Sequence, residues 1–151
     1  VWRHGDFIIR TESGGFRIQG RSDATLNPGG VRIGTADLYR VVDGIPEIAD
    51  SLVIGPSLKG EVRVVLVVTL SGSHTLDDEL RAKIKRELKE KASPRHVPDH
   101  IFSVTEIPYT RNMKKVEIAV RNIFESRPVT NRESLANAEC LDEYERLAKD
   151  F

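Results

Sequence analysis

One apolar run limits the possible folds of this chain more than any other feature of its sequence. Between Val62 and Leu70, the side chains of Val62 and Val64–Val68 are apolar, so apolar groups fall on both faces of a strand at this position. A strand with two apolar faces lies inside its sheet, because an edge or half-exposed strand alternates apolar with polar residues. We therefore expect Val62–Leu70 to be a central strand.

The rest of the chain predicts short strands alternating with helices. Thr75 to Asp78 resembles a capping box, and an apolar residue then recurs every four positions along one helical stripe. Proline and glycine separate the elements. This order indicates an α+β fold, a small sheet with helices packed on it, preceded by a β-hairpin. The expected elements are strands Phe7–Arg10, Phe16–Gln19, Ile48–Ile54, Val62–Leu70 and Ile101–Val104, with helices at Ala36–Asp43 (capped by Thr35), Leu76–Leu88, Val116–Phe124 and Leu141–Leu147.

Composition excludes several classes of protein. The chain has 151 residues, which suits one domain or one domain with an attached piece. Lys plus Arg and Asp plus Glu both number 23, so no overall basic field favours nucleic acid or a membrane surface. The single cysteine, Cys140, permits no internal disulfide and favours a reducing, cytoplasmic setting. The first residue is Val1, which suggests a fragment of a longer protein.

Two segments near the start contain candidate ligand-binding residues. Asp6 follows a glycine at a strand start, where a carboxylate can accept hydrogen bonds from a ribose diol or simply occupy a surface turn. Further on, Gly29 and Gly30 allow close approach of the backbone to a narrow ligand. Arg21 and Arg32 flank these glycines and suit phosphate or carboxylate, although both are compatible with surface positions.

The third candidate segment, Pro108–Val116, carries three cations. Arg111, Lys114 and Lys115 stand at the predicted start of a helix, where positive charge opposes the helix dipole. An unfavourable charge of this kind indicates an anionic partner, or else a solvated basic turn.

In this order and spacing, the three segments resemble the adenylate-forming superfamily, which includes acyl-CoA synthetases, firefly luciferases and nonribosomal adenylation domains. The resemblance covers nearly the whole chain, and the spellings around Asp6, Asn27–Thr35 and Tyr109–Glu117 are similar to the acetoacetate-activating branch. It implies a two-step ligase: ATP, with Mg²⁺, and an acid give an acyl-adenylate and pyrophosphate, and coenzyme A then displaces AMP.

The resemblance also implies residue roles. Asp6, Arg21 and Arg32 would contact the nucleotide, and Asp23 would be the hinge about which the small domain rotates. Gly30 would line the pantetheine tunnel, and Gly29 and Lys89 would contact coenzyme A. Lys114 would be the catalytic lysine that bridges the substrate carboxylate and the α-phosphate.

The sequence departs from the family at three positions. Asn112 and Met113 replace the usual Ser-Gly before the catalytic lysine, and Ala24 replaces a second acid after the hinge. Counting from Thr110 and Arg111 selects Lys114, but Lys115 is its neighbour.

By the same resemblance, residues 1–21 would end the large N-terminal adenylation domain, 22–127 would be the mobile small domain, and 128–151 a C-terminal extension with a helix. The expected partners are small molecules, the adenylation domain, and a lysine acetyltransferase and deacetylase acting on the catalytic lysine. Two alternatives stay open: a ligase for acetate or another short acid, and a non-catalytic α+β regulatory or interaction module. An adenylation domain preceding Val1 in the same reading frame would separate the ligases from the module.

Overall fold

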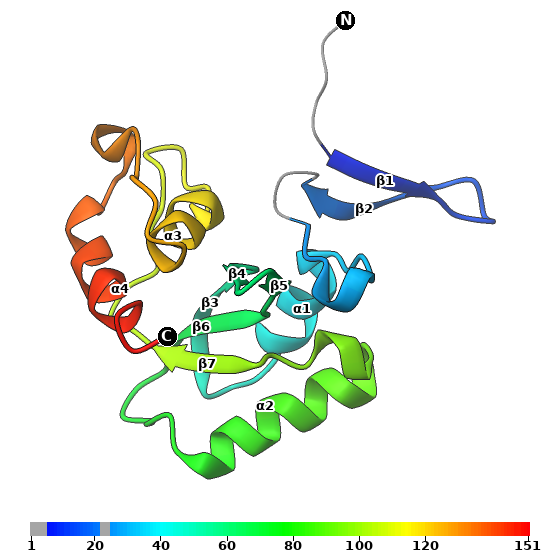
Figure 1. Cartoon of the computed structure of the whole chain (residues 1–151). Helices are drawn as coiled ribbons and strands as arrows, with labels where there is room; N and C mark the ends of the chain where they lie inside the picture. Colours follow the sequence, from blue (N-terminus) through cyan, green and yellow to red (C-terminus); the bar gives the residue numbers. More distant parts are fainter. Residues whose placement is uncertain (1–5, 22–24) are drawn as a thin grey trace, which may run out of the picture.

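The computed structural model describes residues 6–21 and 25–151 (Figure 1). At its centre is a sheet with the strand order β3–β6–β7, formed by β3 (Ile48–Ile54), β6 (Val65–Leu70) and β7 (His100–Ser103). β6 pairs antiparallel with β3 and parallel with β7. The apolar run is thus central in the sheet, as the sequence predicts.

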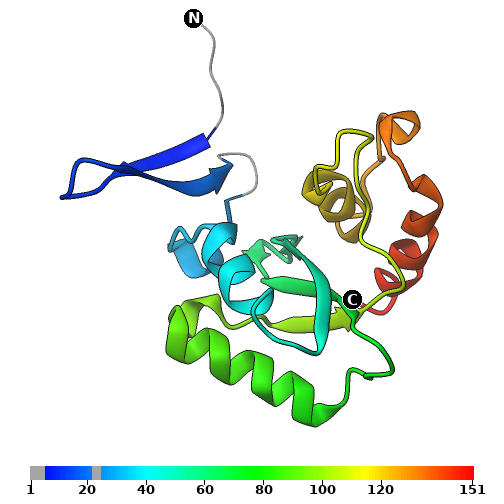
Figure 2. The same ribbon diagram turned by 180° about the vertical axis from the view of Figure 1, so that it is seen from behind.

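The alternating side chains of β6 enter two separate cores, one on each face of the sheet. Leu66 and Val68 pack with α1 (Thr35–Val42) and α2 (Asp78–Lys91). Val65 and Val67 pack on the other face with α3 (Glu117–Phe124) and α4 (Leu141–Leu147). Figures 1 and 2 show the two helix pairs on different sides of the sheet. The α+β prediction, with helices packed on a small sheet, is confirmed.

The predicted strand Val62–Leu70 is too long. Glu61 and Val62 form β5, which pairs with β4 (Ser57–Leu58) in a separate hairpin. Between β5 and β6, the Asp99 carboxylate accepts a hydrogen bond from the Val64 amide at 2.7 Å. That side-chain bond replaces a strand partner, so the ladder of β6 begins only at Val65.

Two predicted helix caps are wrong. α1 includes Thr35, its N-cap is Gly34, and no side chain caps it. In α2 the cap is Asp77, which accepts from the Leu80 amide at 2.8 Å, in place of Thr75. Asp ranks above Thr as an N-cap residue, and its carboxylate also places negative charge at the positive end of the helix dipole.

The N-terminal hairpin consists of β1 (Asp6–Arg10) and β2 (Phe16–Arg21). Its apolar side chains lie outside both cores: Ile8 is 58% exposed and Phe16 74% exposed. Short 3-10 helices connect the other elements, namely η1 (Pro28–Gly30), η2 (Pro94–His96), η3 (Arg132–Ser134) and η4 (Ala138–Cys140).

Candidate functional site

The basic segment forms a tight turn between β7 and α3. The Val116 amide donates to the Pro108 carbonyl at 3.2 Å, and the Thr110 amide donates to the Lys114 carbonyl at 2.9 Å. At the tip, Met113 has a φ of 57°, in the left-handed region. The helix begins at Glu117, one residue after the predicted start, with Val116 as its N-cap, so Lys114 and Lys115 directly precede the helix.

Lys115 is fixed against the sheet by three groups. Its ammonium donates to the Ser51 carbonyl at 2.6 Å and lies 2.9 Å from the Asp50 carboxylate. It also lies 4.5 Å from the centroid of the Tyr39 ring, a cation–π contact. The side chain is 23% exposed, so these contacts are partly shielded from water. Lys115 therefore anchors the turn to β3.

The Asp50 carboxylate bonds to a residue at each end of the turn. In addition to Lys115, it accepts the Tyr109 hydroxyl at 2.7 Å. Burial raises the pKa of Asp50, but the hydrogen bonds from Lys115 and Tyr109 outweigh burial and hold that pKa below its ordinary range. Burial, followed by the bond to Asp50, raises the pKa of Tyr109, so its phenol stays protonated as a donor. The carboxylate thus remains charged at neutral pH.

Lys114 takes no part in this anchor. Its side chain is exposed, and among the described residues no hydrogen bond or ion pair involves its ammonium. Only its backbone is held, since its amide donates to the Thr110 hydroxyl at 3.1 Å and its carbonyl accepts from the Thr110 amide. Of the two adjacent lysines, Lys115 is therefore held by contacts within the domain, whereas the ammonium of Lys114 is available to bind an anion.

Tyr39 connects the turn to both helix layers, and nothing in the sequence pattern indicated this role. Its hydroxyl donates to the Glu117 carboxylate at 2.5 Å and accepts from the Val53 amide at 3.1 Å. Burial, with a further contribution from Glu117, raises the pKa of Tyr39, which keeps the hydroxyl a donor. Helical spacing places Tyr39 only as a side chain of α1, so its partners could not be inferred before the fold was known.

The paired glycines lie on a second exposed loop, closed at its base by Leu26 and Ile33. These two residues exchange backbone hydrogen bonds of 3.1 and 2.9 Å, and both side chains are buried. Gly29 and Gly30 have φ of 56° and 78°, and an added Cβ at either position would meet no described atom within 4 Å. Figures 1 and 2 show this loop, at η1, well apart from the turn that precedes α3.

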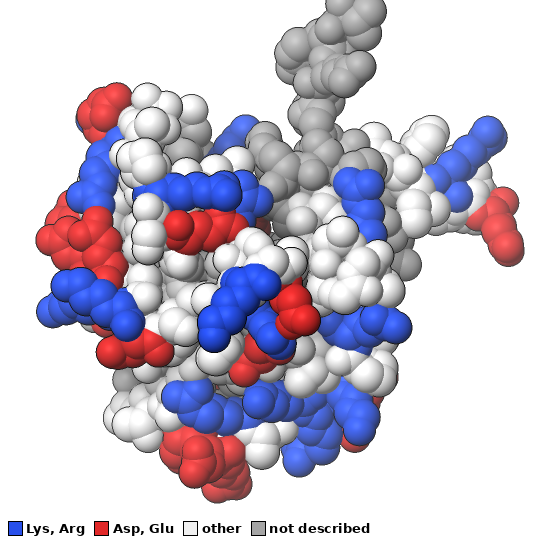
Figure 3. Space-filling model, viewed as in Figure 1, with Lys and Arg blue, Asp and Glu red and all other residues white. Residues whose placement is uncertain are grey.

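The structure therefore groups the predicted site residues into separate sets. Arg32 shares the η1 loop with the glycines and is exposed. Lys89 lies in the last turn of α2, and Lys85 and Arg86 lie one turn before it. All three are exposed and form no ion pair within the described part of the chain. Figure 3, in the view of Figure 1, shows several Lys and Arg side chains over α2 at the bottom of the molecule, with acidic side chains among them. Neither set lies on the Lys114 turn.

The remaining predicted positions are at the N-terminal end. The hairpin register pairs Asp6 directly with Arg21, so these two residues share one end of β1 and β2. Asp23, the predicted hinge, lies outside the described residues.

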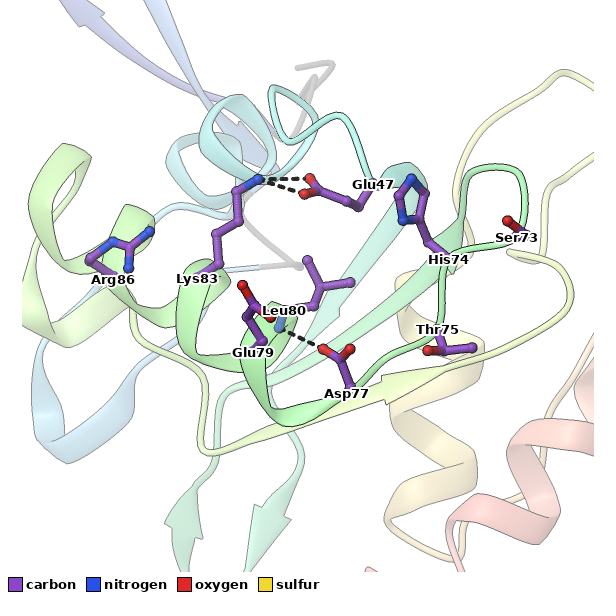
Figure 4. Close-up of a pocket in the computed structure, with 9 residues that line it drawn as sticks. All are labelled: Glu47, Ser73, His74, Thr75, Asp77, Glu79, Leu80, Lys83 and Arg86. Atoms are coloured by element: carbon purple, nitrogen blue, oxygen red, sulfur yellow. Dashed lines mark hydrogen bonds and ion pairs between the residues drawn. The ribbon is translucent and has the colours of Figure 1, made fainter.

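A polar hollow of about 430 Å³ lies beside the start of α2 (Figure 4). Within it, Lys83 donates both to Glu47 Oε1 at 2.7 Å and to Glu47 Oε2 at 2.9 Å. Asp77 caps α2 at the same place. Lys83 and Glu47 neutralise each other, and none of the predicted site residues lines the hollow, so it is not the candidate site.

Three other kinds of site receive no support from residues 6–21 and 25–151. No three His, Cys, Asp or Glu side chains gather there in a way that could hold a metal ion. None of the helices in this part combines the length and apolarity that crossing a membrane requires. Cys140 is buried, and burial raises its pKa to about 11, so it is not an activated thiol.

Comparison with known proteins identifies the family of this domain. A sequence profile of the AMP-binding enzyme C-terminal domain matches residues 40–114, which include the end of α1, the sheet, α2 and the turn up to Lys114. Residues 40–114 belong to the AMP-binding enzyme C-terminal domain family. The match ends at the exposed lysine, so η3, η4 and α4 lie beyond the segment that defines this domain family.

Relatives and solved structures place the domain within longer proteins. The chain is 52% identical over 142 residues to a Rhizobium meliloti (strain 1021) protein named acetoacetyl-coenzyme A synthetase, covering 94% of this chain and 22% of that protein. It is 44% identical over 146 residues to the Caenorhabditis elegans acetoacetyl-CoA synthetase, covering 95% of this chain and 21% of that protein. The structure of acetoacetyl-CoA synthetase from Streptomyces lividans aligns with a TM-score of 0.88 at 42% identity, over 99% of this chain and 23% of that one. The chain thus spans about a fifth of the length of these relatives.

The different environments of the two lysines in this AMP-binding C-terminal domain predict different reactivities. Limited treatment with acetic anhydride should acetylate Lys114 several times faster than Lys115, because the Lys115 ammonium is engaged by Asp50 and Ser51. Peptide mass spectrometry at short reaction times measures both sites, with exposed Lys85 as an internal reference. Equal rates for Lys114 and Lys115 would contradict the anchoring described here.

Proposed function

We propose that the chain is the C-terminal part of an ATP-dependent acid–CoA ligase that makes acetoacetyl-CoA, AMP and pyrophosphate through an acyl-adenylate. The carrying observation is an exposed, unpaired Lys114 on an anchored turn, within a chain 52% identical to a protein named acetoacetyl-coenzyme A synthetase. The identity of the acid as acetoacetate is inferred only from the names of the relatives. A ligase for acetate or another short acid would use the same turn, and no observation favours a non-catalytic module.

In the proposed first half-reaction, Lys114 supplies positive charge between two anions. Attack of a carboxylate on the α-phosphate of ATP brings like charges together, and a fixed ammonium stabilises the transition state most when water is excluded. The turn is suited to this task because Lys115, Asp50 and Tyr109 hold its base while the Lys114 side chain is unengaged. The rest of the ATP site and the acid pocket would come from the large adenylation domain.

The nucleotide contacts that we propose are Asp6, Arg21 and Arg32. The pairing of Asp6 with Arg21 in the hairpin supports a shared role, since a carboxylate for the ribose hydroxyls and a guanidinium for a phosphate would lie at one end of it. The Mg²⁺ that accompanies ATP would bind its phosphates. We assign it no ligand in this chain, because no cluster of suitable side chains exists among the described residues.

In the proposed second half-reaction, the η1 loop and α2 meet coenzyme A. Gly29 and Gly30 would let the pantetheine arm pass close to the backbone, and open space at both positions supports this. Lys89, with Lys85 and Arg86 beside it, would attract the phosphates of coenzyme A. The separation of this side from the Lys114 turn fits a domain that presents a different face in each step.

The N-terminal hairpin supports the proposed domain division, with 1–21 completing the large domain, 22–127 the mobile domain and 128–151 an extension. Ile8, Ile9, Phe16 and Ile18 are all exposed on the hairpin, which leaves an apolar surface for the adenylation domain to cover. Rotation about Asp23 would then move the small domain between its two positions.

Two further assignments follow from the same proposal. Lys114 would be a substrate for a lysine acetyltransferase and deacetylase, since acetylation removes the charge that the first step needs. A cytoplasmic location suits both the free thiol of Cys140 and the small-molecule substrates.

Replacement of Lys114 tests the first half-reaction. In the full-length ligase, Lys114→Ala should slow acyl-adenylate formation by about 100- to 1,000-fold, because it removes one preorganised charge from the transition state. Thioester formation from supplied acyl-adenylate should stay close to wild type. Pyrophosphate exchange and thioester release, measured separately, report the two steps. Lys115→Ala is the comparison, and a step-specific loss there with a normal Lys114→Ala would overturn the assignment.

A bulky residue at Gly30 tests the second half-reaction. Gly30→Leu should stop thioester formation while adenylation persists, because the side chain would project into the proposed path of the thiol. At a φ of 78° any side chain also costs about 1–2 kcal/mol of stability. Gly72→Leu is the matched control, since Gly72 has a φ of 57° with no neighbour within 4 Å but lies on the β6–α2 loop. If Gly72→Leu produced the same loss, strain would explain the effect and the tunnel assignment would fail.

A further inference from the structure

The segment after α3 runs alongside the turn that carries Lys114. The Arg111 amide donates to the Ser134 carbonyl at 3.2 Å, and the Ala136 amide donates to the Tyr109 carbonyl at 2.8 Å. Thr110 and Leu135 form an antiparallel bridge between these bonds. Figures 1 and 2 show the two segments side by side. Residues 134–136 therefore act as a short strand added to the outside of the turn.

Asn137 ends this pairing with a side chain that bonds three groups of the approach to the turn. Its Oδ1 accepts from the Tyr109 amide at 2.9 Å. Its Nδ2 donates to the Ile107 carbonyl and to the Glu106 carboxylate, both at 3.0 Å. A carboxamide can donate and accept at the same time, so it fixes the peptide units on both sides of Pro108 in one conformation. Neither a carboxylate nor a hydroxyl at this position could make all three bonds.

The extension that carries Asn137 is itself firmly held. Leu135, Cys140, Leu141 and Tyr144 are buried in the same core as α3. The Tyr144 hydroxyl donates to the Glu106 carbonyl at 3.0 Å, and Glu143 accepts from the Thr105 amide at 2.9 Å. Asn137 thus presents its side chain from a rigid base.

The turn needs outside support because its own backbone is strained. Met113 occupies the left-handed region, which a side chain with a Cβ enters at a cost. On the sheet side, Asp50 holds the Tyr109 hydroxyl and Lys115. On the outer side, Asn137 holds the Tyr109 amide. Tyr109 is fixed at both its backbone and its side chain, five residues before Lys114.

We propose that Asn137 is a positioning residue for Lys114, and that the extension clamps the turn in the conformation used for acyl-adenylate formation. The inference rests on the proposed function of Lys114 and adds to it. Asn137 touches no substrate in this account and acts only through its bonds to Glu106, Ile107 and Tyr109. It lies beyond residues 40–114, the segment matched by the domain family.

The first experiment measures both half-reactions in the full-length ligase. Asn137→Ala should reduce adenylation by about 10- to 100-fold, since small misplacement of a reacting group has effects of that size. Thioester formation from supplied acyl-adenylate should stay within about twofold of wild type, because that step does not use Lys114. Glu145→Ala is the matched control: it removes an ion pair with Arg132 inside the extension and should leave both steps unchanged.

A second variant covers the case in which Asn137→Ala does not fold. Asn137→Asp keeps the acceptor for the Tyr109 amide and loses both donated bonds, so adenylation should again fall while thioester formation persists. Hydrogen exchange on the 151-residue chain gives an independent readout. In Asn137→Ala the Tyr109 and Arg111 amides should exchange faster, whereas the Val67 amide in the central strand should not change.

The outcomes separate the two proposals. A Lys114→Ala enzyme with normal adenylation would overturn the proposed function of the lysine. If Lys114→Ala is impaired but both Asn137 variants adenylate normally, the positioning role is wrong. If the Asn137 variants lose both half-reactions equally, Asn137 serves only stability and the inference is also wrong.

Discussion

The carboxylate of Asp50 joins the central sheet to the turn that presents the candidate catalytic lysine. It receives the Lys115 ammonium at 2.9 Å and the Tyr109 hydroxyl at 2.7 Å, from the two sides of that turn. Because these bonds are partly buried, they fix the base of the turn more firmly than a surface ion pair would. This junction engages the Lys115 ammonium, whereas the neighbouring Lys114 stays exposed.

The two-sided core explains how one small domain can carry two separate sets of proposed site residues. Alternate side chains of β6 pack into the two helix layers. The turn before α3 and the η1 loop before α1 are therefore attached to opposite faces of one sheet. A rigid body with two active faces is what a rotating domain requires, because rotation then exchanges one set for the other without internal rearrangement. The AMP-binding C-terminal domain family and the Streptomyces lividans structure share this fold.

Local patterns in the sequence predicted most of this fold, and long-range contacts account for the errors. The apolar run identified β6 as central, and the stripe of Leu80, Ile84 and Leu88 identified the buried face of α2. The start of β6 was predicted three residues too early, because the Val64 amide donates to the carboxylate of Asp99, which lies far along the chain. Motif spacing alone likewise placed the candidate catalytic lysine at Lys114 but left the adjacent Lys115 as an alternative. Their difference arises from Asp50 and Ser51, which sequence neighbours do not reveal.

The most direct test of the Asp50 junction is the unfolding free energy of the chain and of its Asp50→Asn variant as a function of pH. In the folded protein the pKa of Asp50 lies below its ordinary value of 3.8. The charged carboxylate therefore stabilises the fold at pH above 3.8, and this stabilisation is lost as the pH falls through the folded-state pKa. At pH about 7 the variant should be less stable by about 1.5–3 kcal/mol, the range for hydrogen bonds to charged groups. The difference should shrink steadily below pH about 4. A variant as stable as wild type at neutral pH, or a deficit that persists unchanged in acid, would contradict the account.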